Sequence, residues 1–272
     1  MIRRDLQAVI EMFSQLKQLI LVLLLPMLMA EELANDTEHT SEKIEPRIYG
    51  GARTTITKLG GYAVQICQQT KLICTGTLIS TKHVVTSAHC VENKSYRMYH
   101  VVSGETKHRS KLRTIAKLNY IADARLHPDY NKFNFIADIA VLKVTHPIRS
   151  VYVGYLPICK SKLAAKDVVT IAGWGETEHT DDSLRTLTVP VIDKKECEDK
   201  VKFDLPDNVI CAGSYNSKTV CNGDSGGPLV FKGQLCGVST WTYECGNRQQ
   251  PDIFMSTYAY KDFIKKCVEQ MK

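Results

Sequence analysis

Short apolar runs separated by turn residues recur along the chain after residue 60. The runs are short and rich in Val, Ile and Thr, which is typical of β-strands. They occupy residues 63–67, 74–80, 83–86, 139–144, 168–172, 187–192 and 235–241. Many short strands of this kind predict an all-β fold, either a sandwich or barrels.

Only the C-terminal residues have the periodicity of a solid helix. Apolar side chains recur there at i, i+3, i+4, i+7 and i+8, at Tyr260, Phe263, Ile264, Cys267 and Val268. This spacing predicts a C-terminal α-helix with one apolar face. No glycine-rich phosphate loop, internal repeat or low-complexity tract accompanies it.

The first 30 residues differ in composition from the rest. Residues 19–30 read LILVLLLPMLMA, follow basic residues and end in alanine, which is typical of a secretory signal peptide. The run is shorter than the roughly 20 apolar residues of a membrane span. We therefore predict a signal peptide over 1–30, with an uncleaved anchor as the alternative and Met12 as a second possible start. Residues 31–47 are polar and acidic, which predicts an exposed linker or pro-segment.

The chain has 10 cysteines, none before Cys67. Behind a secretory leader, an even number of cysteines predicts an oxidising compartment and disulfides. The absence of a CxxC pair or a histidine-rich cluster argues against a structural metal. The net charge is +6, and the charges are scattered except at 107–113, where KHRSKLR is either a solvated loop or a patch for an anionic partner.

Ser225 stands among small residues in TVCNGDSGGP, residues 219–228. A serine that attacks an acyl carbon needs backbone N–H groups directed at the oxygen that becomes negative. The surrounding glycines allow the main chain to turn tightly and to approach a substrate closely. This arrangement makes Ser225 a candidate nucleophile.

A serine nucleophile needs a base, and the base needs a carboxylate that fixes its tautomer. His89 lies in TSAHC at the end of a β-type run, where Cys90 can hold it in place. Asp138 opens the apolar run DIAVLKV, where an acid needs a partner. The order His89, Asp138, Ser225 matches the chymotrypsin arrangement and not that of subtilisin or the α/β-hydrolases.

The sequence resembles the chymotrypsin/trypsin-like serine endopeptidases from about Ile48 to Met271. The motifs that carry the resemblance are RIYGG, TSAHC, DIAVLKV, GWG, NVICAG, GDSGGP and STW. The resemblance implies a protease domain over 48–272 with two packed antiparallel six-stranded β-barrels, an active site between them and a C-terminal helix. It also implies peptide-bond hydrolysis through an acyl-enzyme.

The resemblance further implies three disulfides, which are Cys74–Cys90, Cys197–Cys211 and Cys221–Cys245. The four remaining cysteines are Cys67, Cys159, Cys236 and Cys267, and four cysteines can form two disulfides in three ways. Among these pairings we favour Cys159–Cys236.

By the same resemblance, Arg47–Ile48 is the activation bond. Cleavage after Arg47 would free an ammonium at Ile48, which would insert and pair with Asp224. An unpaired buried carboxylate is costly by several kcal/mol, so Asp224 has a reason to accept a cation. The pair would then set the N–H groups of Gly223 and Ser225 for the oxyanion. The alternative is that Arg47 is an ordinary linker residue.

The specificity pocket implied by the resemblance comprises Thr219, Asn222, Thr240, Trp241, Thr242 and Asp252. Trypsins carry Asp where Thr219 stands, which argues against a simple trypsin specificity. Asp252 replaces a usual glycine and would project into the pocket, near enough to hydrogen-bond Thr219. Thr242 replaces another glycine and would narrow the entrance, beside a backbone rail at Thr240 and Trp241. Basic, medium apolar or mixed, and small substrate side chains all remain open.

We therefore predict a secreted, extracellular serine endopeptidase made as a zymogen. Its expected partners are protein or peptide substrates, an activating trypsin-like protease and protein protease inhibitors, with no nucleic acid and no stable membrane span. The segment after Glu105 lacks the clustered carboxylates of a calcium loop, so we expect no metal and no cofactor. The alternative function is that of a catalytically silent homologue that binds or signals.

Overall fold

The computed structural model describes residues 48–271 apart from 93, 109–118, 135, 177–181, 217 and 247–248. The predicted signal peptide, the pro-segment and Arg47 lie outside the described residues, as does most of the basic segment 107–113. Within the described part of the chain, no helix has the length and apolar character needed to cross a membrane.

The first barrel is a closed ring of antiparallel strands in the order β2-β3-β4-β7-β6-β5. The strands are β2 (Ala63–Gln68), β3 (Lys71–Leu78), β4 (His83–Thr86), β5 (Tyr99–Ser103), β6 (Asn119–Leu126) and β7 (Ala140–Val144). The ring closes because β5 pairs with both β2 and β6. Its interior holds fully buried apolar side chains such as Val64, Ile66, Leu78 and Leu142.

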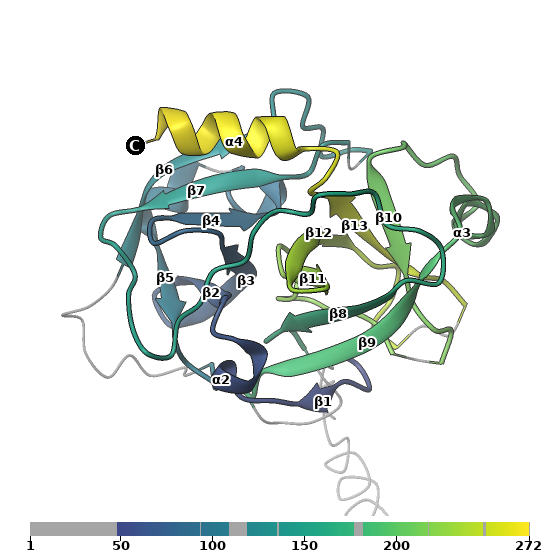
Figure 1. Ribbon diagram of the computed structural model, residues 1–272, viewed down its shortest axis with the longest axis horizontal. Helices are drawn as coiled ribbons and strands as arrows, with labels where there is room; N and C mark the ends of the chain where they lie inside the picture. Colours follow the sequence, from purple (N-terminus) through teal and green to yellow (C-terminus); the bar gives the residue numbers. More distant parts are fainter. Residues whose placement is uncertain are drawn as a thin grey trace, which may run out of the picture. The chain divides into compact units, whose positions relative to one another are not determined.

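The second barrel is built in the same way. It comprises β8 (Val168–Gly173), β9 (Arg185–Ile192), β10 (Val209–Ala212), β11 (Pro228–Phe231), β12 (Gln234–Trp241) and β13 (Asp252–Ser256). Pairing of β8 with both β9 and β11 closes the ring, and the short β1 (Ala52–Arg53) adds to β9. Figure 1 shows the two rings side by side. The prediction of two six-stranded antiparallel barrels is confirmed, and the sandwich is not formed.

The predicted C-terminal helix is present as α4 (Lys261–Gln270), which lies next to β7 (Figure 1). The apolar face of α4 buries Ile264 and Cys267 in an apolar cluster, and Phe263 and Val268 pack against this cluster. Two further α-helices among the described residues, α2 (Ile56–Leu59) and α3 (Lys194–Val201), were not predicted, nor were two short 3-10 helices, η1 (Ala88–Cys90) and η2 (Lys94–Met98). Helix α3 lacks an apolar period because only Cys197 and Val201 are buried, and Asp193 caps it by accepting from the Lys195 N–H (2.9 Å).

One apolar cluster joins the two barrels to α4. It combines first-barrel residues such as Val85 and Ile139 with Trp174 and Val238 from the second barrel, and with Ile264 from α4. The cluster holds the edge of one barrel against the other, which positions residues distant in sequence at the junction.

The three disulfides implied by the resemblance are formed, and so is Cys159–Cys236. Cys67 and Cys267 are free buried thiols, so the expectation that an even number of cysteines would all pair is wrong for these two. They lie in different elements, β2 and α4. Burial raises the pKa of the Cys67 thiol to about 12, so this side chain serves as a small apolar group of the interior.

Candidate active site

His89 and Asp138 are brought together by the pairing of β4 with β7. Thr86, near the end of β4, pairs with Ala140, so the residues that follow β4 lie beside those that precede β7. The fully buried Asp138 accepts two hydrogen bonds from His89, at Oδ2 from Nδ1 (2.7 Å) and at Oδ1 from the backbone N–H (2.8 Å). Because the first bond keeps the hydrogen on Nδ1, the lone pair of Nε2 remains available as a base.

Ser225 lies in the loop between β10 and β11, against the segment that carries His89. Its carbonyl oxygen accepts from the Thr75 N–H of β3 (2.9 Å) and lies 3.9 Å from Cys90 Sγ. At the next residue, a Cβ on Gly226 would overlap Thr86 Oγ1 and would lie 3.1 Å from Ser87 N. The serine loop therefore packs without space against residues 86–90.

Some backbone N–H groups of this loop are not used within the protein. The N–H groups of Cys221, Asp224, Gly226 and Gly227 all donate to protein acceptors. Among the described residues, no protein acceptor receives a hydrogen bond from the N–H of Asn222, Gly223 or Ser225. The unused donors of Gly223 and Ser225, on either side of Asp224, can stabilise an oxygen that becomes negatively charged.

Asp224 is fully buried next to Ile48. Its Oδ2 accepts from the Ile48 N (3.3 Å) and the Cys221 N–H (3.0 Å), and its Oδ1 accepts from Gly175 (2.7 Å). Burial raises the pKa of Asp224 to about 7, and these three backbone bonds oppose the shift. Gly173 and Gly175 of the GWG motif are required here, because a Cβ at either would overlap the Asp224 carboxyl group.

Asp252 is a second buried acid, and its environment differs from the prediction. Its Oδ2 accepts from the Val220 N–H (2.9 Å), whereas the Thr219 hydroxyl accepts from the Gly246 N–H (2.8 Å). The expected hydrogen bond between Thr219 and Asp252 is not formed, since the Thr219 hydroxyl lies at the Gly246 N–H and Asp252 Oδ1 has no partner among the described residues. Burial raises the pKa of Asp252 to about 7, and interactions with Val220 N and the Thr242 side chain oppose the shift. Within the described structure, Asp252 Oδ1 has no partner at hydrogen-bonding geometry.

The other residues assigned to the pocket lie along β12 and the serine loop. Thr240 is buried and donates its hydroxyl to the Val238 carbonyl (3.2 Å). Trp241 is half-buried, with its ring 4.1 Å from that of Tyr243. Asn222 is exposed and donates its side-chain Nδ2 to Glu176 Oε2 (2.7 Å).

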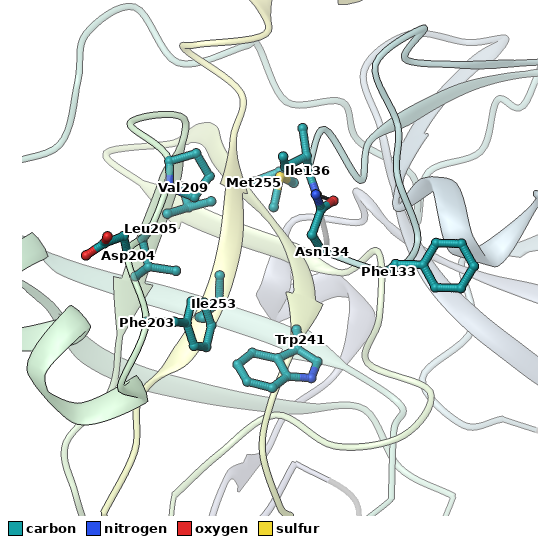
Figure 2. A pocket seen from close by; sticks show the side chains of 11 residues that line it. Phe133, Asn134, Ile136, Phe203, Asp204, Leu205, Val209, Trp241, Ile253 and Met255 are labelled. Carbon is teal, nitrogen blue, oxygen red and sulfur yellow. Dashed lines mark hydrogen bonds between the residues drawn. The ribbon is translucent and has the colours of Figure 1, made fainter.

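An apolar cavity adjoins Trp241, and the sequence did not predict it (Figure 2). It has a volume of about 430 Å³ and lies between β12–β13, the loop after α3 and the loop before Asp138. Its aromatic lining residues are Phe133, Phe203 and Trp241. Phe133 is 86% exposed and Phe203 is 44% exposed, so both are available to a ligand. The sequence does contain a signal for this cavity, because Phe133 and Phe203 each stand in a polar segment between apolar runs.

Two groups of side chains have metal-ligand types close together. They are Cys74, His89 and Cys90, and Glu176, Cys221 and Cys245. In each group both sulfurs belong to one disulfide, so they are not thiolates and cannot bind a metal as such. Neither group is therefore a metal centre.

Comparison with known proteins identifies the family. A family model described as Trypsin matches residues 48–264. The chain belongs to the trypsin family of serine endopeptidases. This trypsin-family chain is 32% identical in sequence to Seminase of Drosophila melanogaster, and the match covers 84% of each chain. It is 33% identical to a trypsin of Phaedon cochleariae, and that match covers 76% of this chain and 84% of that protein. It also resembles the structure of neuropsin, a serine protease expressed in the limbic system of mouse brain, with a TM-score of 0.73 and 26% identity, over 81% of this chain and all of that one.

Proposed function

We propose that this trypsin-family chain is a secreted serine endopeptidase, made as a zymogen, with His89, Asp138 and Ser225 as its catalytic triad. The observation that carries the proposal is the buried Asp138 carboxylate, which binds both Nδ1 and the backbone N–H of His89 beside the loop of Ser225. The four disulfides support an extracellular location.

In the proposed reaction, His89 Nε2 takes the proton from Ser225 Oγ as that oxygen attacks the substrate carbonyl carbon. The N–H groups of Gly223 and Ser225 bind the oxyanion, and Asp138 stabilises the imidazolium. The proton then passes from His89 to the leaving amine, and an acyl-enzyme remains on Ser225. A water deprotonated by His89 hydrolyses this ester and restores the enzyme.

A serine-directed fluorophosphonate tests the triad. After activation, we expect one covalent adduct, on Ser225, and none in His89→Ala or in enzyme unfolded before labelling. Peptide cleavage should disappear in parallel. An activated, folded protein that forms no adduct on Ser225 and cleaves no peptide would favour the silent homologue.

We also propose that cleavage after Arg47 activates the enzyme. Ile48 N is 3.3 Å from the buried Asp224 carboxylate, so the ammonium formed by cleavage would arise where a negative charge needs a partner. Arg47→Gln should give a silent zymogen after trypsin treatment, whereas Lys58→Gln, at an exposed site nearby, should activate normally. N-terminal sequencing would identify the new end as Ile-Tyr-Gly-Gly. Full activity with the 47–48 bond intact would refute this step.

For specificity, we propose that Asp252 favours substrates with Arg or Lys before the scissile bond. A buried carboxylate whose Oδ1 lacks a hydrogen bond would be neutralised by an incoming cation. Thr242 limits the size of the side chain admitted, and the apolar cavity at Trp241 accepts an apolar side chain elsewhere in the substrate. A peptide-library profile should lose the basic preference in Asp252→Asn and keep it in Asp199→Asn, an exposed acid of α3. An unchanged preference in Asp252→Asn would show that Asp252 does not read the substrate.

A further inference from the structure

Thr75 of β3 makes two hydrogen bonds to the serine loop of the other barrel. Its backbone N–H donates to the Ser225 carbonyl (2.9 Å), and its hydroxyl donates to the Gly223 carbonyl (2.8 Å). The Thr75 carbonyl in turn accepts from Thr86 Oγ1 (2.9 Å). Thr75 is therefore anchored in the first barrel and binds both residues whose N–H groups are assigned to the oxyanion hole.

Two peptide planes meet at the Gly223 Cα: the Gly223 N–H belongs to the plane shared with Asn222, and the Gly223 carbonyl belongs to the plane shared with Asp224. The Asn222 carbonyl accepts from the Glu176 N–H (2.8 Å). Because the peptide is planar and trans, this bond directs the Gly223 N–H to the opposite side. The hydroxyl of Thr75 holds the second plane through the Gly223 carbonyl.

Gly223 itself does little to fix the angle between these two planes, so each plane depends on hydrogen bonds from neighbouring residues. It has φ +90 and no side chain, so its backbone is intrinsically free to rotate. Threonine suits the task of holding it, because a β-branched side chain has few χ1 rotamers. An oxyanion donor is effective only when it is oriented before the charge develops.

We propose that Thr75 is a positioning residue for the oxyanion hole. Its hydroxyl holds the Gly223 carbonyl and so helps to keep the Gly223 N–H directed at the substrate oxygen. This inference rests on the proposed function of Ser225. A positioning role differs from a purely structural one in its effect. Removal of the hydroxyl should weaken binding of the transition state and should leave the stability of the fold unchanged.

The same strand provides a matched control. Thr77 lies two residues further along β3, so its side chain is on the same face as that of Thr75. It is fully buried, and its hydroxyl has no hydrogen-bond partner among the described residues. Thr77→Val therefore removes the same oxygen from the same strand without breaking a hydrogen bond.

The experiment compares Thr75→Val, Thr75→Ser and Thr77→Val in the activated, full-length enzyme. For Thr75→Val we expect kcat to fall about 10- to 100-fold with KM within about 2-fold, less than the roughly 10²- to 10³-fold loss on removing an oxyanion donor outright. A peptide aldehyde, which mimics the tetrahedral intermediate, should bind more weakly by a similar factor. Thr75→Ser should keep kcat within about 3-fold of wild type because it retains the hydroxyl, and Thr77→Val should behave as wild type.

Equal kcat for Thr75→Val and Thr77→Val would overturn the inference, and so would a loss confined to melting temperature. Both outcomes differ from failure of the proposed function, in which wild type itself would form no fluorophosphonate adduct on Ser225. If Thr75→Val does not fold, Thr75→Ala supports the same comparison, because it also removes the hydroxyl and adds no thiol beside the Cys74–Cys90 disulfide.

Discussion

The packing of the serine loop against the histidine segment can be tested with Gly226→Ala. Gly226 has φ +79, and a Cβ there would overlap Thr86 Oγ1 and the Thr75 carbonyl oxygen. Gly233, in the turn between β11 and β12, has a similar φ of +71, but nothing lies within 4 Å of a Cβ placed on it. Gly233→Ala is therefore a control with the same backbone strain and no collision.

The expected losses of stability follow from the backbone strain at a positive φ and from the collision of the added Cβ. A left-handed non-glycine residue costs about 1 kcal/mol, which is the whole effect expected for Gly233→Ala. Overpacking adds about 1–3 kcal/mol at Gly226, so the free energy of unfolding should fall there by about 2–4 kcal/mol. For a domain of this size, 1 kcal/mol corresponds to about 2–4 °C in melting temperature. We expect losses of about 3 °C for Gly233→Ala and about 10 °C for Gly226→Ala.

Circular dichroism melts in a Ser225→Ala background would measure both variants without autolysis. In the active background, kcat should fall at least about 10-fold in Gly226→Ala, because relief of the collision displaces the neighbouring Ser225. Gly233→Ala should retain its kcat. If the two variants had the same melting temperature and the same kcat, the serine loop would not be packed against residues 75 and 86, and the reasoning about the site would be refuted.

Three further predictions concern the buried acids and thiols. Asp138→Asn should lower kcat about 10⁴-fold with little change in melting temperature, because the amide favours the wrong tautomer of His89; a drop below 10-fold would contradict this. Asp252, with its pKa near 7, is ionised only above that pH, so the ratio of kcat/KM for Arg over Leu substrates should rise through pH 7 and stay flat in Asp252→Asn. Cys67 and Cys267 should react with iodoacetamide only after unfolding, since both are buried; labelling of the native protein, followed by mass spectrometry, would contradict their burial.

Local patterns in the sequence determined much of the fold. Each of the apolar runs expected to be a strand coincides with one, and the amphipathic C-terminal segment is helical. These segments could be predicted because burial of one face leaves a periodic trace in neighbouring residues. Helix α3 left no such trace, since it buries only two side chains.

The sequence also determined which residues are candidates for the chemistry. The order of His89, Asp138 and Ser225, together with the glycines around the serine, indicates the reaction without the three-dimensional structure. Residue types and their order could do this because acyl transfer needs a particular set of groups, whatever holds them together.

Only the tertiary structure decided which distant residues meet. Of the three possible pairings of four cysteines, it contains the Cys159–Cys236 disulfide. Asp252 accepts a hydrogen bond from the Val220 N–H and not from Thr219. The Thr75 hydroxyl donates to the Gly223 carbonyl, 148 residues further along the chain. Contacts of this kind depend on the closure and register of two barrels and on how their edges pack. Many weak interactions set that geometry together, so no short segment of sequence contains it.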